Sequence, residues 1–268
     1  MSSRRRYTLC AALLALGCRE AAGQQPPPAE SAPEPTRQLR PPSASTAALS
    51  PSPSPTLTAE PRCREQPAQD FLLRRHQLAK IGASADEQRR IEAARKRSVD
   101  YRTRHYGRFP GFGSRRDNPH APQFYAKRTK FMGLPVVLHE KIVPVLACVE
   151  AALRRDCTAQ PYRPRHLSGL RFENTFKDYE VSNHVYGIAL DIDSDLNPCC
   201  GCVGKWSQVA ACRRPVSSPF ERMAMPRCWV EVFERHGFYW LGHDELQDTM
   251  HFEFLGDPER ILLDPPTP

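Results

Sequence analysis

The chain has 268 residues and a formal net charge of +8, and 12 of its 27 prolines lie in the first quarter. The remainder has ordinary globular composition, which favours one folded domain and excludes a chain that is disordered throughout. The positive charge by itself indicates no particular reaction.

The first 22 residues have the features of an export signal. A basic start precedes an apolar run that is too short to cross a bilayer as a helix. The ending Ala15-Leu16-Gly17-Cys18 resembles the bacterial lipobox, in which the Cys becomes the lipidated first residue of the mature protein. We therefore expect a lipoprotein signal that ends before Cys18, with ordinary signal-peptidase cleavage near Ala22 as the alternative. The protein is expected in the periplasm or cell envelope.

Residues 23–68 are predicted to form a disordered linker. They are rich in Pro, Ser, Ala, Thr and Gln, and such a segment cannot bury enough apolar surface to fold. The linker would hold a folded domain, residues 69–268, away from a membrane anchor.

Residues 69–105 are predicted to be helical, with a break at Gly82. Between positions 71 and 108 there are eleven Lys or Arg and four Asp or Glu. A basic stripe could bind nucleic acid or an anionic cell-wall polymer. A solvated helical face explains the charges more simply, and export argues against nucleic acid.

The next elements follow from apolar spacing and from Gly and Pro content. Residues 106–123 are predicted to be a loop, either a lid or a substrate rim. Apolar residues at helical spacing predict a core helix over 136–153, and a second helix is expected over 228–235. Residues 237–242 are expected to form a strand or a turn.

Eight cysteines remain after the signal region, and an even number in an oxidising compartment favours disulfides. The cluster Cys199-Cys200-Gly201-Cys202, with Cys212 or Cys228, could instead form a structural zinc site. Cys148 and Cys157 could pair with each other or with the later cluster.

Two short segments near the C-terminus carry metal-binding residue types on predicted strands. Residues 188–193 and 250–254 both alternate apolar and polar side chains, which is the period of a strand with two different faces. Asp191 and His251 therefore lie on polar faces and would converge if the strands share a sheet. His184 can join them from the turn that precedes Gly187. Two His and one Asp leave a zinc coordination position open for water.

The pattern SxHxxGxAxD from Ser182 to Asp191, followed by DxxHFE from Asp248 to Glu253, resembles the zinc D-alanyl-D-alanine peptidases. That group comprises the vancomycin-resistance dipeptidases and carboxypeptidases and the phage L-alanyl-D-glutamate endolysins. The resemblance covers about residues 134–254 and is strongest from Ser168 onward.

The resemblance implies a role for each matching residue. His184, Asp191 and His251 would be the zinc ligands, and Asp248 would be the catalytic acid/base. Asp248 has the form found in the endolysin-like branch, since other branches place Glu there. Arg171, in Ser168-Gly169-Leu170-Arg171, matches the arginine that helps to bind the substrate carbonyl and to stabilise the transition state.

Two further carboxylates lie close to these residues. Glu253 is two residues from His251 on the same strand face, so it is a candidate partner for orienting an imidazole, with a surface carboxylate as the alternative. Glu245 could compete with Asp248 for proton transfer, although a polar turn beside a strand needs no catalytic explanation.

Taken together, these features predict one α+β domain in which a small antiparallel-rich sheet carries a zinc site and packs against helices. The expected function is zinc-dependent hydrolysis of peptidoglycan peptides that contain D-amino acids, most simply as a D-Ala-D-Ala carboxypeptidase. An L-Ala-D-Glu-type endopeptidase and a non-catalytic peptidoglycan-binding lipoprotein are the alternatives. The protein is expected to be a monomer that binds no nucleic acid and meets the membrane only through a lipid anchor at Cys18.

Overall fold

A computed structural model describes residues 62–78, 80, 82–176, 180–202 and 204–263. The predicted export signal, the lipobox and most of the predicted linker lie outside these residues. Within the described ranges, no helix combines the length and the apolar character that crossing a membrane requires.

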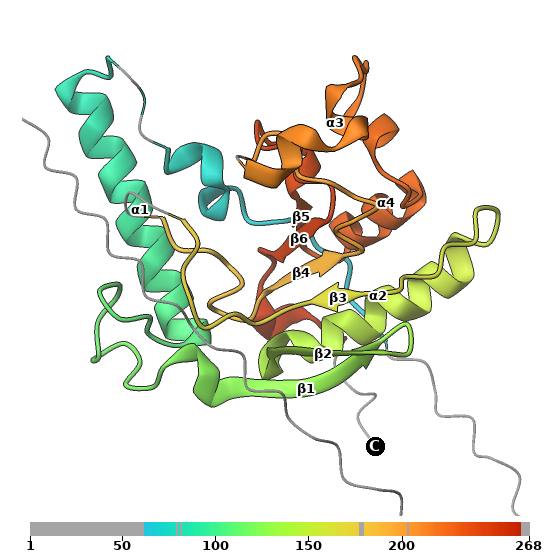
Figure 1. The fold of residues 1–268 in the computed structure, drawn as a ribbon. Helices are drawn as coiled ribbons and strands as arrows, with labels where there is room; N and C mark the ends of the chain where they lie inside the picture. Colours follow the sequence, from blue (N-terminus) through green and yellow to red (C-terminus); the bar gives the residue numbers. More distant parts are fainter. Residues whose placement is uncertain (1–61, 79, 81, 177–179, 203, 264–268) are drawn as a thin grey trace, which may run out of the picture. The chain divides into compact units, whose positions relative to one another are not determined.

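A four-stranded antiparallel sheet with the order β3-β4-β6-β5 forms the centre of the fold (Figure 1). Its strands are β3 (Leu167–Ser168), β4 (Ala189–Ile192), β5 (Phe238–Trp240) and β6 (His251–Phe254). The two strands predicted from alternation, β4 and β6, are neighbours in this sheet. The predicted α+β fold is therefore confirmed.

The other regular elements surround this sheet. A separate antiparallel hairpin consists of β1 (Ala126–Phe131) and β2 (Leu134–His139). The α-helices are α1 (Ala85–Tyr106), α2 (Val143–Asp156), α3 (Ala210–Arg213) and α4 (Arg227–Arg235). Short 3-10 turns lie at Asp70–Leu72, Arg74–His76, Pro122–Tyr125, Glu140–Ile142, Gly204–Gln208, Pro219–Arg222, Leu241–His243 and Pro258–Arg260.

The core helix predicted over 136–153 is wrong in its first part, because β2 occupies residues 134–139. Met132 and Gly133 both have positive φ, 50° and 84°, and join β1 to β2. A two-residue turn of this hand matches the twist of an antiparallel pair. Pro144 lies in the first turn of α2, where a missing N–H costs nothing, so the helix starts there. A short apolar run has no period that separates strand from helix.

The predicted helical region 69–105 is divided in two. Residues 85–106 form α1, and Ser84 caps it by accepting a hydrogen bond from the Glu87 N–H at 3.2 Å. Among the described residues of this region before Gly82, the regular structure consists of the two 3-10 turns between residues 70 and 76. The helix expected over 228–235 is confirmed as α4.

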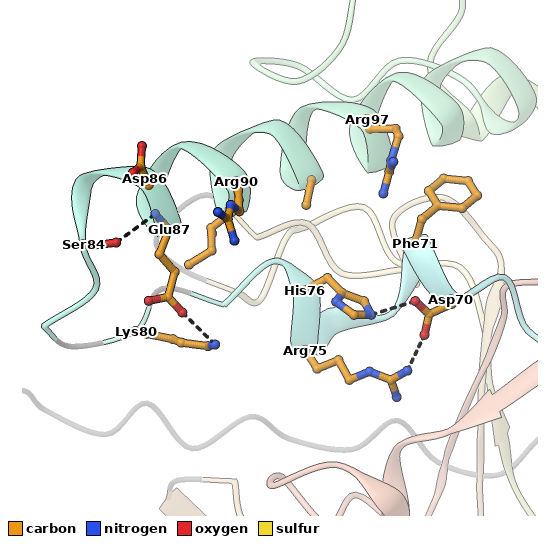
Figure 2. A pocket seen from close by; sticks show the side chains of 12 residues that line it. Asp70, Phe71, Arg75, His76, Lys80, Ser84, Asp86, Glu87, Arg90 and Arg97 are labelled. Atoms are coloured by element: carbon orange, nitrogen blue, oxygen red, sulfur yellow. Dashed lines mark hydrogen bonds and ion pairs between the residues drawn. The ribbon is translucent and has the colours of Figure 1, made fainter.

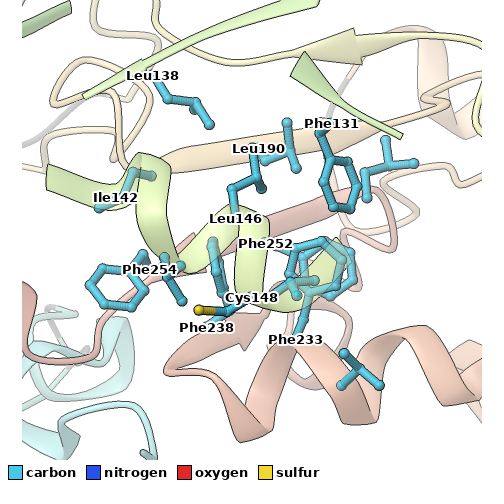
Figure 3. Packing of buried hydrophobic residues seen from close by; sticks show 14 of the residues in the cluster. Phe131, Leu138, Ile142, Leu146, Cys148, Leu190, Phe233, Phe238, Phe252 and Phe254 are labelled. Carbon is cyan, nitrogen blue, oxygen red and sulfur yellow. The ribbon is translucent and has the colours of Figure 1, made fainter. Parts of the chain in front are cut away.

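The hydrophobic core covers one face of the sheet. Leu190 and Phe252 are register partners on β4 and β6, and both are fully buried. Phe233 of α4 stacks on Phe252 with ring centroids 4.2 Å apart, and Leu146 of α2 belongs to the same cluster (Figure 3). Burying a side chain of this size contributes about 1.5–3 kcal/mol. A shift of one residue would place these side chains on the opposite face, so the core fixes the register of β4 and β6.

Four disulfides use all eight of the cysteines beyond the signal region, which confirms the preference for disulfides over a thiolate zinc site. Cys148 and Cys157 do not pair with each other or with the 199–202 cluster. The pairs are Cys63–Cys148, Cys157–Cys228, Cys199–Cys202 and Cys200–Cys212.

The folded part includes residues 62–68, whose composition predicts a linker. Cys63 is cross-linked to α2, and the backbone N–H of Arg64 donates to the Ile261 carbonyl at 2.8 Å. Gln66 likewise donates from its backbone to Arg235 O at 2.8 Å. An extended segment can be held by backbone hydrogen bonds and a disulfide without burying much apolar surface. Composition therefore could not locate this boundary.

Candidate metal centre

The register of the two central strands brings a carboxylate and an imidazole together. Asp191 on β4 and His251 on β6 are direct antiparallel partners, so their side chains leave the sheet on the same face. His184 comes from the turn before β4, which is closed by a hydrogen bond from Gly187 N–H to His184 O at 3.0 Å. Gly187 has φ +69°, and a Cβ there would lie 2.9 Å from the backbone N of His139. The turn that presents His184 therefore requires glycine.

Three donor atoms converge at one point. His184 Nε2 lies 3.1 Å from Asp191 Oδ1 and 3.1 Å from His251 Nδ1, and His251 Nδ1 lies 2.9 Å from Asp191 Oδ1. All three residues are buried. Zinc bonds of about 2.0–2.1 Å in a tetrahedron separate neighbouring ligand atoms by about 3.3 Å. The observed spacing therefore suits a zinc ion.

Hydrogen bonds on the far side of each ring orient both imidazoles. His184 Nδ1 lies 2.6 Å from the Gly169 carbonyl oxygen, and His251 Nε2 lies 3.4 Å from Glu253 Oε2. With N–H groups donating to these oxygens, the remaining ring nitrogens present lone pairs to each other and to the Asp191 carboxylate. Three acceptors this close repel one another unless a proton or a metal cation lies between them. The donor set therefore fits a metal ion.

Even without a metal ion, the groups around the three donor atoms favour a positive charge where those atoms converge. Burial lowers the pKa of His251, but the hydrogen bonds and negative charges of Asp191 and Glu253 outweigh burial and raise it to about 10. Burial raises the pKa of Asp191, yet the charges and hydrogen bonds of the two histidines hold it well below its usual range. Burial lowers the pKa of His184. A divalent cation would take the place of the proton on His251.

Asp248 lies in the loop that leads into β6, and the disulfide loop holds this segment. Cys199 and Asp248 form an isolated antiparallel bridge, and the Thr249 N–H donates to Pro198 O at 3.2 Å. Among the described residues, Asp248 Oδ1 is buried without a hydrogen-bond partner. Burial raises the pKa of Asp248 to about 6. An uncommitted acceptor with this pKa suits a proton carrier at neutral pH.

A second cluster of possible ligand atoms comprises Asp248 and the two sulfurs of Cys199 and Cys202. The sulfurs are joined in a disulfide, so neither can act as a thiolate ligand. A thiolate zinc site at this cluster is therefore excluded in the oxidised protein.

Arg171 follows β3 and reaches the same centre. Its backbone N–H donates to the His184 carbonyl oxygen at 3.0 Å, and its guanidinium donates to Asp191 Oδ2. The side chain is 36% exposed, whereas that of Asp191 is 7% exposed. Arg171 therefore places a fixed positive charge between the buried donors and solvent.

The two other candidate carboxylates, Glu253 and Glu245, lie in different surroundings. Glu253 is buried and bonded, so its alternative as a surface carboxylate is wrong. Glu245 has an exposed side chain that forms an ion pair with Arg74 at 3.4 Å. Glu245 has neither the burial nor the free acceptor that distinguishes Asp248.

Three groups in this centre were not predicted from the sequence: the Gly169 carbonyl, Asn183 and Arg102. Asn183 Nδ2 donates to Glu253 Oε2 at 2.6 Å, and Arg102 Nε donates to Asn183 Oδ1 at 2.7 Å. Asn183 lies inside the recognised motif, between Ser182 and His184. Arg102 is in the basic run of α1, where no sequence signal separates it from solvated arginines.

A separate hollow of about 530 Å³ lies between the turns at residues 70–76 and helix α1 (Figure 2). Much of its charge is already paired. Asp70 bonds both Arg75 and His76, and Lys80 bonds Glu87 at 2.9 Å. None of the six predicted site residues lines it. The hollow is therefore distinct from the candidate metal centre.

Comparison with models of known protein families gives a match. Residues 176–254 match a family model described as D-alanyl-D-alanine carboxypeptidase, and this segment contains β4, β6 and the three converging donors. Comparison with curated proteins and with solved structures found no match. Through that segment, which carries the three converging donors, the chain is similar to the D-alanyl-D-alanine carboxypeptidase family of peptidases.

Proposed function

We propose that this protein is a zinc-dependent peptidase that hydrolyses peptidoglycan peptides containing D-amino acids, most simply as a D-Ala-D-Ala carboxypeptidase. The observation that carries the proposal is the convergence of His184 Nε2, Asp191 Oδ1 and His251 Nδ1 within 3.1 Å of one another. These residues are the proposed zinc ligands, and they lie inside the segment that matches the peptidase family.

A zinc ion supplies Lewis acidity at such a site, polarising a carbonyl and making water a stronger acid. Asp248 takes the proton of the attacking water on its free oxygen and returns it to the leaving amine. Arg171 holds a permanent positive charge beside the oxygen that becomes negative. Gly169 and Glu253 keep the two imidazoles in the orientation that directs Nε2 and Nδ1 at the same point. Hydrolysis by these groups needs no covalent enzyme intermediate.

Location supports the choice of substrate. Four disulfides are typical of a protein that folds in an oxidising compartment, and an exported peptidase would meet peptidoglycan directly. Anchoring through Cys18 is part of the same proposal.

The direct test is incubation of the zinc-loaded protein with purified muropeptides, followed by mass analysis. Loss of one terminal D-Ala supports carboxypeptidase action. Cleavage at an internal bond would instead assign an endopeptidase of the L-Ala-D-Glu type. If no product depends on Asp248, the enzyme proposal fails and a peptidoglycan-binding role replaces it.

The raised pKa of Asp248 predicts the acid side of the pH profile. Asp248 must be ionised to accept a proton, so kcat/KM should rise as pH rises toward about 6 and fall as pH drops below that value. The charge of bound zinc favours the carboxylate, so the midpoint is expected at or below about 6. The measurement is kcat/KM between about pH 4 and 9, with zinc content recorded at each pH because acid also protonates the histidines. A rate independent of pH down to about 4 with zinc still bound would contradict the assignment.

Arg171→Met should lower kcat by about 10²- to 10³-fold, because it removes the positive charge beside the developing oxyanion. Zinc should remain bound, since the three donor atoms are unchanged. Arg165→Met is the matched control: Arg165 is also close to β3, but its exposed side chain pairs with Asp195 at 2.7 Å. Steady-state kinetics with metal analysis decide the outcome, and an Arg171→Met enzyme with the parental kcat would rule out the role.

A further inference from the structure

A buried chain of hydrogen bonds links helix α1 to the candidate metal centre. Arg102 Nε donates to Asn183 Oδ1 at 2.7 Å, Asn183 Nδ2 donates to Glu253 Oε2 at 2.6 Å, and the same oxygen lies 3.4 Å from His251 Nε2. All four residues are only 5–6% exposed. The chain therefore runs through the protein interior rather than along its surface.

The groups on either side of Asn183 fix the direction of the hydrogen bonds in this chain. A guanidinium can only donate and a carboxylate can only accept, so Asn183 must turn its oxygen to Arg102 and its NH₂ to Glu253. The reverse orientation would place NH₂ against guanidinium and oxygen against carboxylate. Arg102 and Glu253 therefore fix the amide from its two sides, and loss of Arg102 removes the constraint on the amide oxygen.

Arg102 is itself held firmly. Its Nη1 donates to Ser98 Oγ one turn earlier on α1, and its Nη2 donates to the Leu72 carbonyl oxygen at 3.3 Å. A buried charge is tolerated when hydrogen bonds satisfy it, and here each nitrogen of the guanidinium has an acceptor. The side chain is therefore pre-organised to fix Asn183.

We propose that Arg102 is a positioning residue for the metal centre: acting through Asn183 and Glu253, it fixes the His251 ring so that Nδ1 faces Asp191 and His184. Glu253 held by Asn183 accepts the Nε2–H of His251, and that hydrogen bond leaves the lone pair of Nδ1 free to bind a metal ion. Helix α1 lies outside residues 176–254, so this contribution comes from a part of the chain that the family match does not include. The inference rests on the proposed zinc site.

The experiment measures zinc affinity of the full-length chain by competition with a chromophoric chelator. Arg102→Met should weaken zinc binding by about 10-fold or more, and Glu253→Gln should do so to a similar extent. In the Arg102→Met/Glu253→Gln double variant the loss should not exceed the larger single loss, because both changes break the same chain. Arg90→Met, an exposed arginine on the same helix that lines the hollow of Figure 2, should keep the parental affinity.

Each other outcome overturns the inference. If a folded Arg102→Met protein binds zinc with the parental affinity, Arg102 has no positioning role. If the losses of zinc affinity multiply in the double variant, Arg102 acts independently of Glu253. If Arg102→Met does not fold, as judged by circular dichroism, Asn183→Leu tests the same link: weaker zinc binding supports the inference and parental affinity refutes it. A parental protein that binds no zinc would instead defeat the proposed function, so the two failures are distinguishable.

Discussion

A His251→Ala variant is expected to lose stoichiometric zinc and, with it, all measurable peptidase activity. The substitution removes one of three donor atoms that lie about 3 Å apart, and two protein ligands hold zinc poorly. Loss of a supporting partner alone typically costs about 10- to 100-fold in metal affinity, so loss of a ligand should exceed that range. Metal analysis after dialysis and chelator competition measure the effect.

Thermal unfolding provides a second readout for this variant. Zinc at about 1,000 times its dissociation constant stabilises the native state by about 4 kcal/mol, so added zinc should raise the Tm of the parent and leave that of His251→Ala unchanged. His166→Ala is the matched control, because its side chain is exposed and it is not one of the three converging donors. One tightly held zinc per chain in His251→Ala would show that the ion binds elsewhere.

Asp248→Asn is expected to reduce kcat by about 10²- to 10⁴-fold while leaving zinc binding intact. The amide has nearly the same shape as the carboxylate but cannot accept the proton of the attacking water. Because Asp248 is not one of the three converging donors, metal content should stay at the parental level. Steady-state kinetics on the muropeptide identified as substrate, with metal analysis of the same preparation, provide the measurement.

Glu245→Gln is the control for Asp248→Asn. It makes the same carboxylate-to-amide change three residues earlier, at an exposed side chain paired with Arg74. Its kcat should remain at the parental level. Equal losses in both variants would mean that the charge of the whole loop matters, and Asp248 would then have no specific role.

The central strands and the converging residues could be predicted because their signals are local. Alternation over a few residues placed Asp191 and His251 on the same kind of strand face, and the spacing from His184 to Asp191 spans one turn and one strand. The register that joins Asp191 to His251 then follows from the apolar partners on the opposite face, Leu190 and Phe252.

The errors have the opposite cause, because they concern contacts between distant parts of the chain. Residues 136–139 are mostly apolar and could also begin a helix. Their pairing with β1, which local sequence does not reveal, makes them a strand. The partner of Cys148 is 85 residues away in a segment that composition assigned to the linker. Arg102 and Asn183 are 81 residues apart, so no local pattern could single out this arginine among the others of α1.

The disulfide connectivity also constrains how the protein reaches its native state. Cys157 pairs with Cys228, although four other cysteines lie between them in the sequence, and the Cys199–Cys202 and Cys200–Cys212 pairs interleave. If thiols were oxidised strictly in the order in which they emerge from a translocation channel, Cys157 would meet Cys199 long before Cys228. The native set must then form either after α4 has emerged or by thiol–disulfide exchange from earlier, incorrect pairs. Under sequential oxidation, the native connectivity therefore requires thiol–disulfide exchange, whereas oxidation after α4 has emerged does not.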